Sequence, residues 1–500
     1  MRFTLLIISA LILSACSVTP VKVTQEQIDL RVMQQSKWIE NTQMEITGPL
    51  SLSDAVILAL KHNLEIEQAR YRVLVGQTAL NHSVLGYLPQ LNSNSNRYVR
   101  NNDGGAVDVL PPARDKNSSS TTISWSSLDL GQAYLRAQEL GNEALMEEQQ
   151  QRRVLTRIVR EVLSAYVELA AIEQEIEQSR QILMLLDRSL ARVKLLENSH
   201  LVDPLVLLQY REQLLRLRIQ LEDLELDYLS SKQELMTLIS APGLEVSIVH
   251  KGQNTFNLSL DGTELKVLER FALYHRSDLM ESMYQIKNAG LEIKRAWLDA
   301  LPNFSVGYSS YYDSDPNLRN SEWLQVDLNL AIKVIELLTL PAKLDELEKR
   351  QALEQLASLA NAVAIVGQIR AANIAYQTDK KRLAMESQRT RTLEEIFELR
   401  QQRLSYELMD ELDLYKAQVQ WVIAKVKKAQ AYSQYQRSIL RILEESGVDL
   451  FPTTSATATS SEFKTSVEHW LRDLPSNVSQ LLAQYNGTPK CHAPSLHGCS

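Results

Sequence analysis

The chain has 500 residues, a net charge of −8 and few glycines (16) or prolines (14). A chain this long folds as several domains or as one very elongated unit. Long runs rich in Leu, Ala, Glu, Gln and Arg are typical of coiled coils. Charges of both signs are mixed along the chain and no basic face is concentrated anywhere, which argues against nucleic acid as a partner.

The first residues have the features of a targeting segment. Arg2 is followed by a short apolar run, residues 3–13, which is too short to span a bilayer as a permanent helix. Small residues then precede Cys16, an arrangement that resembles the bacterial lipoprotein cleavage box. We therefore expect a signal peptide over residues 1–15 and a lipidated Cys16, the alternative being an ordinary signal peptide. No later segment approaches 18 consecutive apolar residues, so we expect no transmembrane helix.

Two helices and a hairpin are expected next. A modest helix covers residues 25–40, and a second covers residues 51–86 and ends at Leu88-Pro89. The pattern then changes to strand-like runs at residues 91–99 and 120–130, separated by a loop with Gly and Pro pairs. Two runs of about ten residues have the length of membrane-barrel strands, although the first run is very polar.

A very long helix is expected over residues 132–199, because apolar residues repeat every 3.5 positions, as in helices that pack along other helices. The stripe consists of Ile158, Val162, Ala165, Leu169, Ile172, Ile176, Ser179, Leu183, Leu186, Leu190 and Val193. At about 1.5 Å per residue this helix would be on the order of 100 Å long. After a break at Pro204, a second striped helix returns to about residue 238, which predicts an antiparallel helical hairpin.

The whole plan then repeats. A helix over residues 264–298 ends at Leu301-Pro302, as the earlier one ends at Leu88-Pro89. Strands follow at residues 303–312 and 322–332, and the second alternates Leu or Val with Gln, Asp or Asn. Long helices are expected at residues 341–403 and 409–445. Such duplication is more informative than any single motif.

The strands set a requirement on assembly. Each half supplies two strands, and a four-stranded sheet cannot close into a pore. Unpaired strand edges are not tolerated in lipid. If the strands lie in a membrane, several chains must therefore pool them.

The reactive side chains of the sequence provide little evidence for catalysis or metal binding. No catalytic constellation or phosphate-binding loop is present, so we expect neither an enzyme nor a cofactor. Cys491 and Cys499 flank two histidines near the C-terminus. A disulfide in an oxidising compartment is preferred over a metal site, since the spacing matches no standard metal site.

Residues 451–466 are expected to be a disordered linker, followed by short helices near 466–474 and 478–485. Five aromatic residues of the strands are expected to form a membrane-interface belt: Trp125, Tyr308, Tyr311, Tyr312 and Trp323. Ordinary packing within the strands is the alternative role.

Over residues 52–445 the sequence resembles the TolC-type outer membrane factor (outer membrane efflux protein) family, as a lipoprotein member. The resemblance is carried by Leu52-Ser53-Asp54-Ala55 continuing to Asn63, Gly86-Tyr87-Leu88-Pro89, Ser124-Trp125 with Asp129-Leu130-Gly131, and Leu408 to Asp413 with Ala417-Gln418. The polar first strand and the tail after residue 447 depart from the family pattern.

The resemblance implies a membrane β-barrel joined to a long α-helical coiled-coil barrel. Three protomers would pool four strands each into a 12-stranded barrel, as a homotrimer. The family acts as the exit duct of tripartite efflux pumps or type I secretion systems, with a periplasmic adaptor (membrane fusion protein) and an inner-membrane RND or ABC transporter as partners. Asp410 and Asp413 match the aspartates that close the periplasmic end in many members. Helix capping is the alternative role for both.

The sequence thus predicts a passive outer-membrane channel-tunnel that is lipid-anchored in the outer membrane and projects into the periplasm. The alternatives are a lipid-anchored periplasmic coiled-coil adaptor or scaffold without a pore and, with no supporting residues, an envelope enzyme. The expected domains are a signal peptide (1–15), a leader (16–50), a first repeat (51–262, with strand hairpin 88–132 and helical hairpin 132–240), a second repeat (263–446, with 301–332 and 341–445) and a C-terminal tail (447–500).

Overall fold

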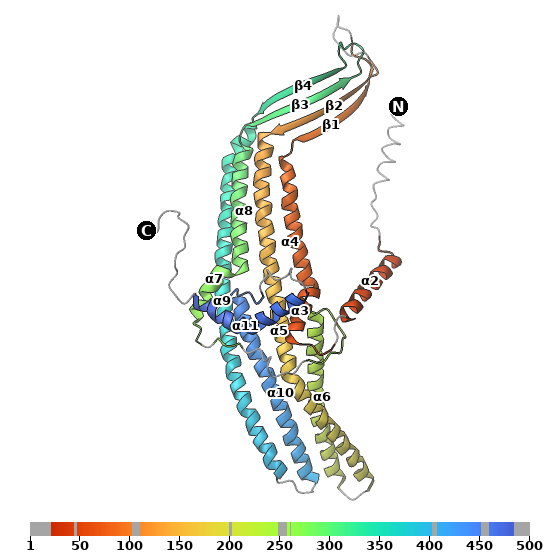
Figure 1. Ribbon diagram of the computed structural model, residues 1–500, viewed down its shortest axis with the longest axis vertical. Helices are drawn as coiled ribbons and strands as arrows, with labels where there is room; N and C mark the ends of the chain where they lie inside the picture. Colours follow the sequence, from red (N-terminus) through yellow and green to blue (C-terminus); the bar gives the residue numbers. More distant parts are fainter. Residues whose placement is uncertain are drawn as a thin grey trace, which may run out of the picture.

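The computed structural model describes residues 22–44, 48–102, 111–199, 203–248, 258–260, 262–402, 408–451 and 460–484. The expected signal peptide, Cys16, Cys491 and Cys499 lie outside the described residues. The molecule is elongated (Figure 1). A sheet forms one end, long helices run to the other end, and short helices cross the middle.

The four expected strands form one antiparallel sheet in the order β1-β2-β3-β4. They are β1 (Gln90–Val99), β2 (Asp115–Ser126), β3 (Asn303–Asp313) and β4 (Glu322–Ala331). Both hairpins are confirmed, and β2 also pairs with β3 from Ser118↔Asp313 to Ser126↔Ser305. This second pairing joins the two repeats, and it leaves β1 and β4 as the two open edges of the sheet.

The bounds of β2 differ from those expected, 120–130. The strand begins at Asp115 because β1 pairs with it along the whole of β1, from Gln90↔Ser124 to Val99↔Asp115. It ends at Ser126 because that hydroxyl accepts a hydrogen bond from Asp129 N (3.2 Å), which begins a helix at once. The same hydroxyl donates to Asn303 Oδ1 (2.8 Å) at the start of β3.

Two very long helices run the full length of the helical part: α5 (Ser127–Ser199) with 73 residues and α9 (Val334–Gln402) with 69. Shorter helices pack along them: α4 (Leu64–Ser83), α6 (Pro204–Leu238), α8 (Ser277–Asp299) and α10 (Leu408–Glu445). The stripe expected on α5 is confirmed, since nine of its eleven side chains are buried and the other two, Leu183 and Leu190, are partly buried. Burying each large side chain contributes about 1.5–3 kcal/mol.

The helices leading to each hairpin are broken, whereas the sequence predicted one continuous helix in each repeat. α3 (Leu52–His62) is separated from α4 at Asn63, and α7 (Leu265–His275) is separated from α8 at Arg276. Each break residue binds the end of a returning helix. Asn63 Nδ2 donates to Leu238 O (3.0 Å), and Arg276 Nη1 donates to Glu445 O (2.9 Å). The breaks therefore satisfy helix-end carbonyls that would otherwise have no partner.

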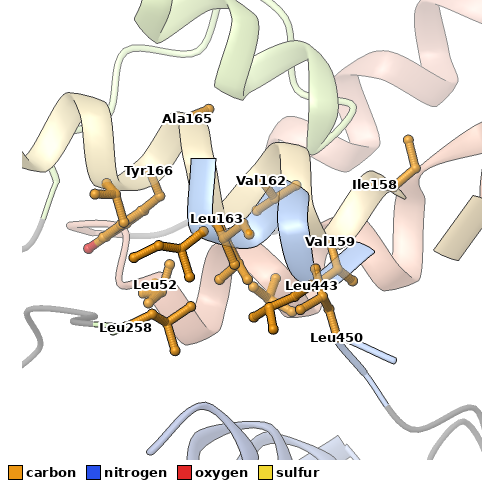
Figure 2. Packing of buried hydrophobic residues seen from close by; sticks show 14 of the residues in the cluster. Leu52, Ile158, Val159, Val162, Leu163, Ala165, Tyr166, Leu258, Leu443 and Leu450 are labelled. Atoms are coloured by element: carbon orange, nitrogen blue, oxygen red, sulfur yellow. The ribbon is translucent and has the colours of Figure 1, made fainter. Parts of the chain in front are cut away.

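The largest core lies at this middle level, where α5 passes between α3, α7 and the ends of α6 and α10 (Figure 1). Figure 2 shows Val162, Leu163 and Tyr166 of α5 packed with Leu52, Leu258 and Leu443. A second core joins the far halves of α5, α6 and α10 through residues such as Leu186, Leu214 and Leu412. The protein is thus a wall of helices that is held together most strongly at its middle.

The C-terminal segment adds to this middle level. α11 (Ser460–Gln484) packs on α3 and α7 and continues through Pro475, whereas two separate short helices were expected. Lys464 Nζ lies 2.7 Å from Asp54 Oδ1. Burial alone would raise the pKa of Asp54, but hydrogen bonds from Lys464 and Ser51 outweigh it and lower that pKa below its ordinary value. The N-terminal helix α2 (Gln25–Met44) is longer than expected and is tied to the rest by Gln43 Nε2, which donates to Pro242 O (2.6 Å).

The structure places Pro341 inside α9, although the sequence predicted a helix beginning there.

One 18-residue window of α9 is apolar enough to cross a membrane by length and composition, and 11% of it is buried. The sequence did not predict this window. Its exposed apolar side chains, such as Leu353 and Leu356, lie opposite the side chains that α9 buries, so they form a stripe rather than an all-round apolar surface.

A glycine at the end of α10 provides a test of the middle level. Gly447 has φ +76°, and a Cβ there would lie 3.1 Å from the Arg276 backbone nitrogen. We expect Gly447→Ala to cost about 1–2 kcal/mol for the left-handed conformation, plus a further cost from the contact. Gly243→Ala is the matched control, since Gly243 has φ +79° with open space around it. Thermal melting in detergent should show the larger loss for Gly447→Ala, and equal losses would contradict the crowding.

Candidate functional site

The sheet has one apolar face, and it is exposed. On β4 the side chains of Leu324, Val326, Leu328 and Leu330 are each at least 64% exposed. Directly paired residues share a face in an antiparallel sheet. The pairings therefore place more apolar residues on this face, namely Leu91, Ile123, Trp125, Phe304, Val306 and Tyr308. Such a large exposed apolar surface indicates contact with lipid or another protein.

The opposite face of the sheet is polar. Thr122 and Ser309 hydrogen-bond across it at 2.9 Å. Most of its other side chains are small amides and hydroxyls: Gln90, Asn92, Asn94, Asn96, Ser118, Ser120, Ser124, Ser305, Gln325 and Asn329. A sheet with one apolar and one polar face is suited to separate lipid from water.

The strand aromatics do not form a single belt. Trp125, Tyr308 and Tyr312 lie on the apolar face, as a belt at a lipid interface requires. Tyr311 and Trp323 lie on the polar face, where their rings stack with centroids 5.2 Å apart. The predicted belt therefore fits only three of the five residues, because neighbouring positions on a strand point to opposite faces.

The apolar band is confined to the helix-proximal part of the sheet, and the outer ends of the strands are polar. Lys116 Nζ of β2 lies 2.6 Å from Asp313 Oδ2 and 4.0 Å from Asp315 Oδ2. Asp315 Oδ2 also accepts a hydrogen bond from Ala113 N (3.1 Å). These contacts hold the ends of the two hairpins together.

The wall of helices has open edges, as the sheet does. α9 packs its stripe around Ile365, Ile369 and Tyr376 against α8, α7 and α10. A second stripe on the opposite side of α9 is exposed: Leu353, Leu356, Leu359, Val363, Ile374, Met385, Ile396 and Leu399. A helix with two opposed apolar stripes is expected to have helical neighbours on both sides.

The helices at the other edge, α6 and α4, have the same property. α6 buries residues such as Leu207, Leu214 and Leu221, and it exposes a second stripe with coiled-coil spacing: Leu205, Leu208, Leu215, Ile219, Leu226 and Leu229. α4 exposes Leu64, Tyr71 and Val75 opposite its buried Ile66, Ala69 and Val73. Both edges of one chain thus present unpaired strands and apolar helix stripes.

The two candidate aperture residues lie at the start of α10, at the end of the molecule farthest from the sheet (Figure 1). Asp410 lies in the first turn of the helix, and its side chain is outside the described part of the chain. Asp413 is half-exposed and forms an ion pair with Arg400 of α9 (2.7 Å), and Lys416 is 3.6 Å away. The sequence did not predict this pairing with Arg400, because the two residues belong to different helices.

A buried carboxyl lies between α9 and α10. Asp379 is 9% exposed, and burial raises its pKa above the ordinary value. Hydrogen bonds from Ser438 and Gln434 and the nearby Arg382 oppose the rise but do not cancel it. Within the described residues, no group of three or more His, Cys, Asp or Glu side chains is placed to hold a metal ion.

The fold is that of outer-membrane channel proteins. The chain is similar to the Campylobacter jejuni CmeC outer membrane channel, with a TM-score of 0.66 and 14% identity over 84% of this chain and 89% of that one. It is also similar to the outer-membrane channel OprN, with a TM-score of 0.63 and 13% identity over 83% of this chain and 92% of that one. A third similar structure is the open state of the Neisseria gonorrhoeae MtrE outer membrane channel. Its TM-score is 0.61, and the sequence identity is 16% over 80% of this chain and 89% of that one.

No protein-family model and no curated protein matches the sequence. The similarity to these solved structures nevertheless confirms, at the level of the fold, the resemblance to the TolC-type outer membrane factor family.

The raised pKa of Asp379 gives a prediction with a defined sign. A carboxyl whose pKa is raised by folding destabilises the protein when it is ionised, so the cost appears above its unfolded pKa of about 3.9 and is absent below it. We expect Asp379→Asn to raise the Tm at pH 7 and to leave it unchanged at about pH 3. Thermal melts at both pH values test this. An Asp379→Asn protein that is less stable at pH 7 would show instead that the ionised carboxylate is needed.

Proposed function

We propose that the protein is an outer-membrane channel-tunnel, the exit duct of a tripartite efflux pump or type I secretion system. The observation that carries the proposal is the combination of an exposed apolar face, a polar face and two open edges in one four-stranded sheet. In lipid every backbone N–H and C=O must be paired, so such a sheet is stable there only inside a closed barrel. One chain cannot close it, and several copies are required.

Copies of the chain are the natural partners at these edges. β4 of one copy would pair with β1 of the next, and the exposed stripe of α9 would pack against those of α4 and α6. Such a contact joins two different surfaces, so a ring forms only if the rotation closes. The resemblance to the outer membrane factor family supports three copies, which would form a homotrimer with a 12-stranded barrel and a coiled-coil tunnel below it.

This architecture would provide a continuous path across the outer membrane and the periplasm. The polar faces of the sheets would line a water-filled lumen, and the helices would extend it through the periplasm. A passive duct needs an energised partner, and the family resemblance supplies a periplasmic adaptor and an inner-membrane RND or ABC transporter. We further propose the domain division given above, a signal peptide over residues 1–15, a lipid anchor at Cys16 and a disulfide between Cys491 and Cys499. No metal or cofactor is part of the proposal.

Assembly through the helix stripes can be tested in one edge helix. Leu215→Lys with Ile219→Lys would place two charges in the proposed contact and remove apolar burial worth about 1.5–3 kcal/mol per side chain. We expect loss of the trimer in detergent, seen by size-exclusion chromatography with light scattering.

Met283→Lys is the matched control for this test. Met283 is 52% exposed and Ile219 is 58% exposed, but Met283 lies on α8, which has long helices on both sides. The control should remain trimeric. A double variant that also stays trimeric would show that the α6 stripe faces something other than another copy.

The aperture can be tested at Asp410 and Asp413. Threefold assembly would bring six carboxylates together at the periplasmic end, and like charges in a constriction attract cations. Arg400 and Lys416 would partly compensate Asp413. We therefore expect Asp410→Ala to reduce the cation preference of single channels in planar bilayers more than Asp413→Ala. Unchanged conductance and selectivity in both variants would leave helix capping as their role.

The second candidate function is a lipid-anchored coiled-coil scaffold without a pore. It accounts for the long helices but leaves the apolar sheet face without a role. A delipidated protein that is soluble, monomeric and non-conducting would favour the scaffold.

A further inference from the structure

The aromatic pair on the polar face of the sheet has no role in closing a barrel. Tyr311 and Trp323 are direct partners in the β3–β4 pairing, and their rings stack with an interplanar angle of 13°. The Trp323 side chain remains 39% exposed. A membrane-interface role requires the lipid-facing side, which is the opposite face.

The surroundings of the pair leave its rings accessible. Its row across the sheet continues through Ser120 and Asn94, both small and polar. In the next row towards the helices, the polar face carries Ser309 and Gln325. Because the two rings stack on each other, each has one covered face and one outer face. The outer faces lie among hydroxyls and amides, and such aromatic faces bind planar rings by stacking.

The charges of the polar face favour cations. Within the four strands, the charged side chains of this face are Lys116, Asp313 and Asp327. Lys116 is paired with Asp313 and also approaches Asp315, which leaves one cation between two carboxylates. Asp327 lies four residues from Trp323 on the same face of β4, about 13 Å along the strand. Narrow passages lined by low-dielectric walls concentrate such a potential.

We propose that Tyr311 and Trp323 form a stacking subsite for planar aromatic cations passing through the lumen. This inference rests on the proposed channel function, and it names the class of solute that the barrel would retain longest. Stacking, with cation–π attraction to Trp323, holds the solute, and Asp327 raises the local cation concentration. Binding is weak enough for the solute to leave, as conduction requires.

The test is block of single-channel current by ethidium, a planar aromatic cation, in planar bilayers. We expect the half-blocking concentration to rise about tenfold in Trp323→Leu, since one stacking contact is lost. Trp125→Leu is the matched control, because Trp125 is 45% exposed on the opposite face, and it should block like the wild type. Tyr311→Leu removes the other ring and serves if Trp323→Leu fails to assemble. Asp327→Asn should raise the half-blocking concentration about threefold.

Two further probes separate stacking from charge alone. Tetraethylammonium has the charge without the ring and should block the wild type and Trp323→Leu equally. Naphthalenesulfonate has the ring with the opposite charge and should block the wild type much less than ethidium.

Equal ethidium block in the wild type, Trp323→Leu and Tyr311→Leu would overturn the subsite while leaving the channel intact. Naphthalenesulfonate block as strong as ethidium block would overturn the cation preference. A wild-type protein that conducts no ions would overturn the channel function and the subsite together.

Discussion

The hydrogen-bonding edges of the four-stranded sheet are the constraint on which the remaining architecture depends. Among the described residues, β1 and β4 each have one edge without a strand partner, and the sheet between them exposes an apolar face. Water could pair those edges, but it would leave the apolar face unfavourably solvated. Lipid suits the face but cannot pair the edges. The proposed edge-to-edge joining of copies of the chain would meet both demands together.

The helices, like the sheet, expose apolar surfaces at both edges of the chain. α9 at one edge and α4 with α6 at the other have exposed apolar stripes opposite their buried ones. The middle level holds these edges in place, because Asn63 and Arg276 tie the broken helices to the ends of α6 and α10. The geometry of the sheet and that of the helical wall are therefore coupled through one core, where α5 meets α3, α6 and α10, and α11 packs on α3 and α7.

Patterns local in sequence were predictable, and contacts between distant segments were not. The stripe of α5 and the alternation in β4 follow from helix and strand periodicity, and the structure confirms both. Pairing of β2 with β3 joins segments far apart in the chain, so no local pattern signals it. The breaks at Asn63 and Arg276 were missed because neither is a glycine or proline. The pairing of Asp413 with Arg400 depends on how two helices meet, and Tyr311 differs from Tyr312 only through the register of the sheet.

Disulfide crosslinking between the two edge strands tests edge-to-edge closure most directly. β1 and β4 are separated by two strands, about 14 Å, so a cysteine in each cannot bond within one chain. Ser93→Cys would be combined in turn with cysteine at Leu324, Val326 and Leu328, with each single variant as control. Edge-to-edge closure predicts a covalent trimer on a non-reducing gel for the matching register. Monomers throughout, or a ladder of ever larger polymers, would contradict a closed ring of three.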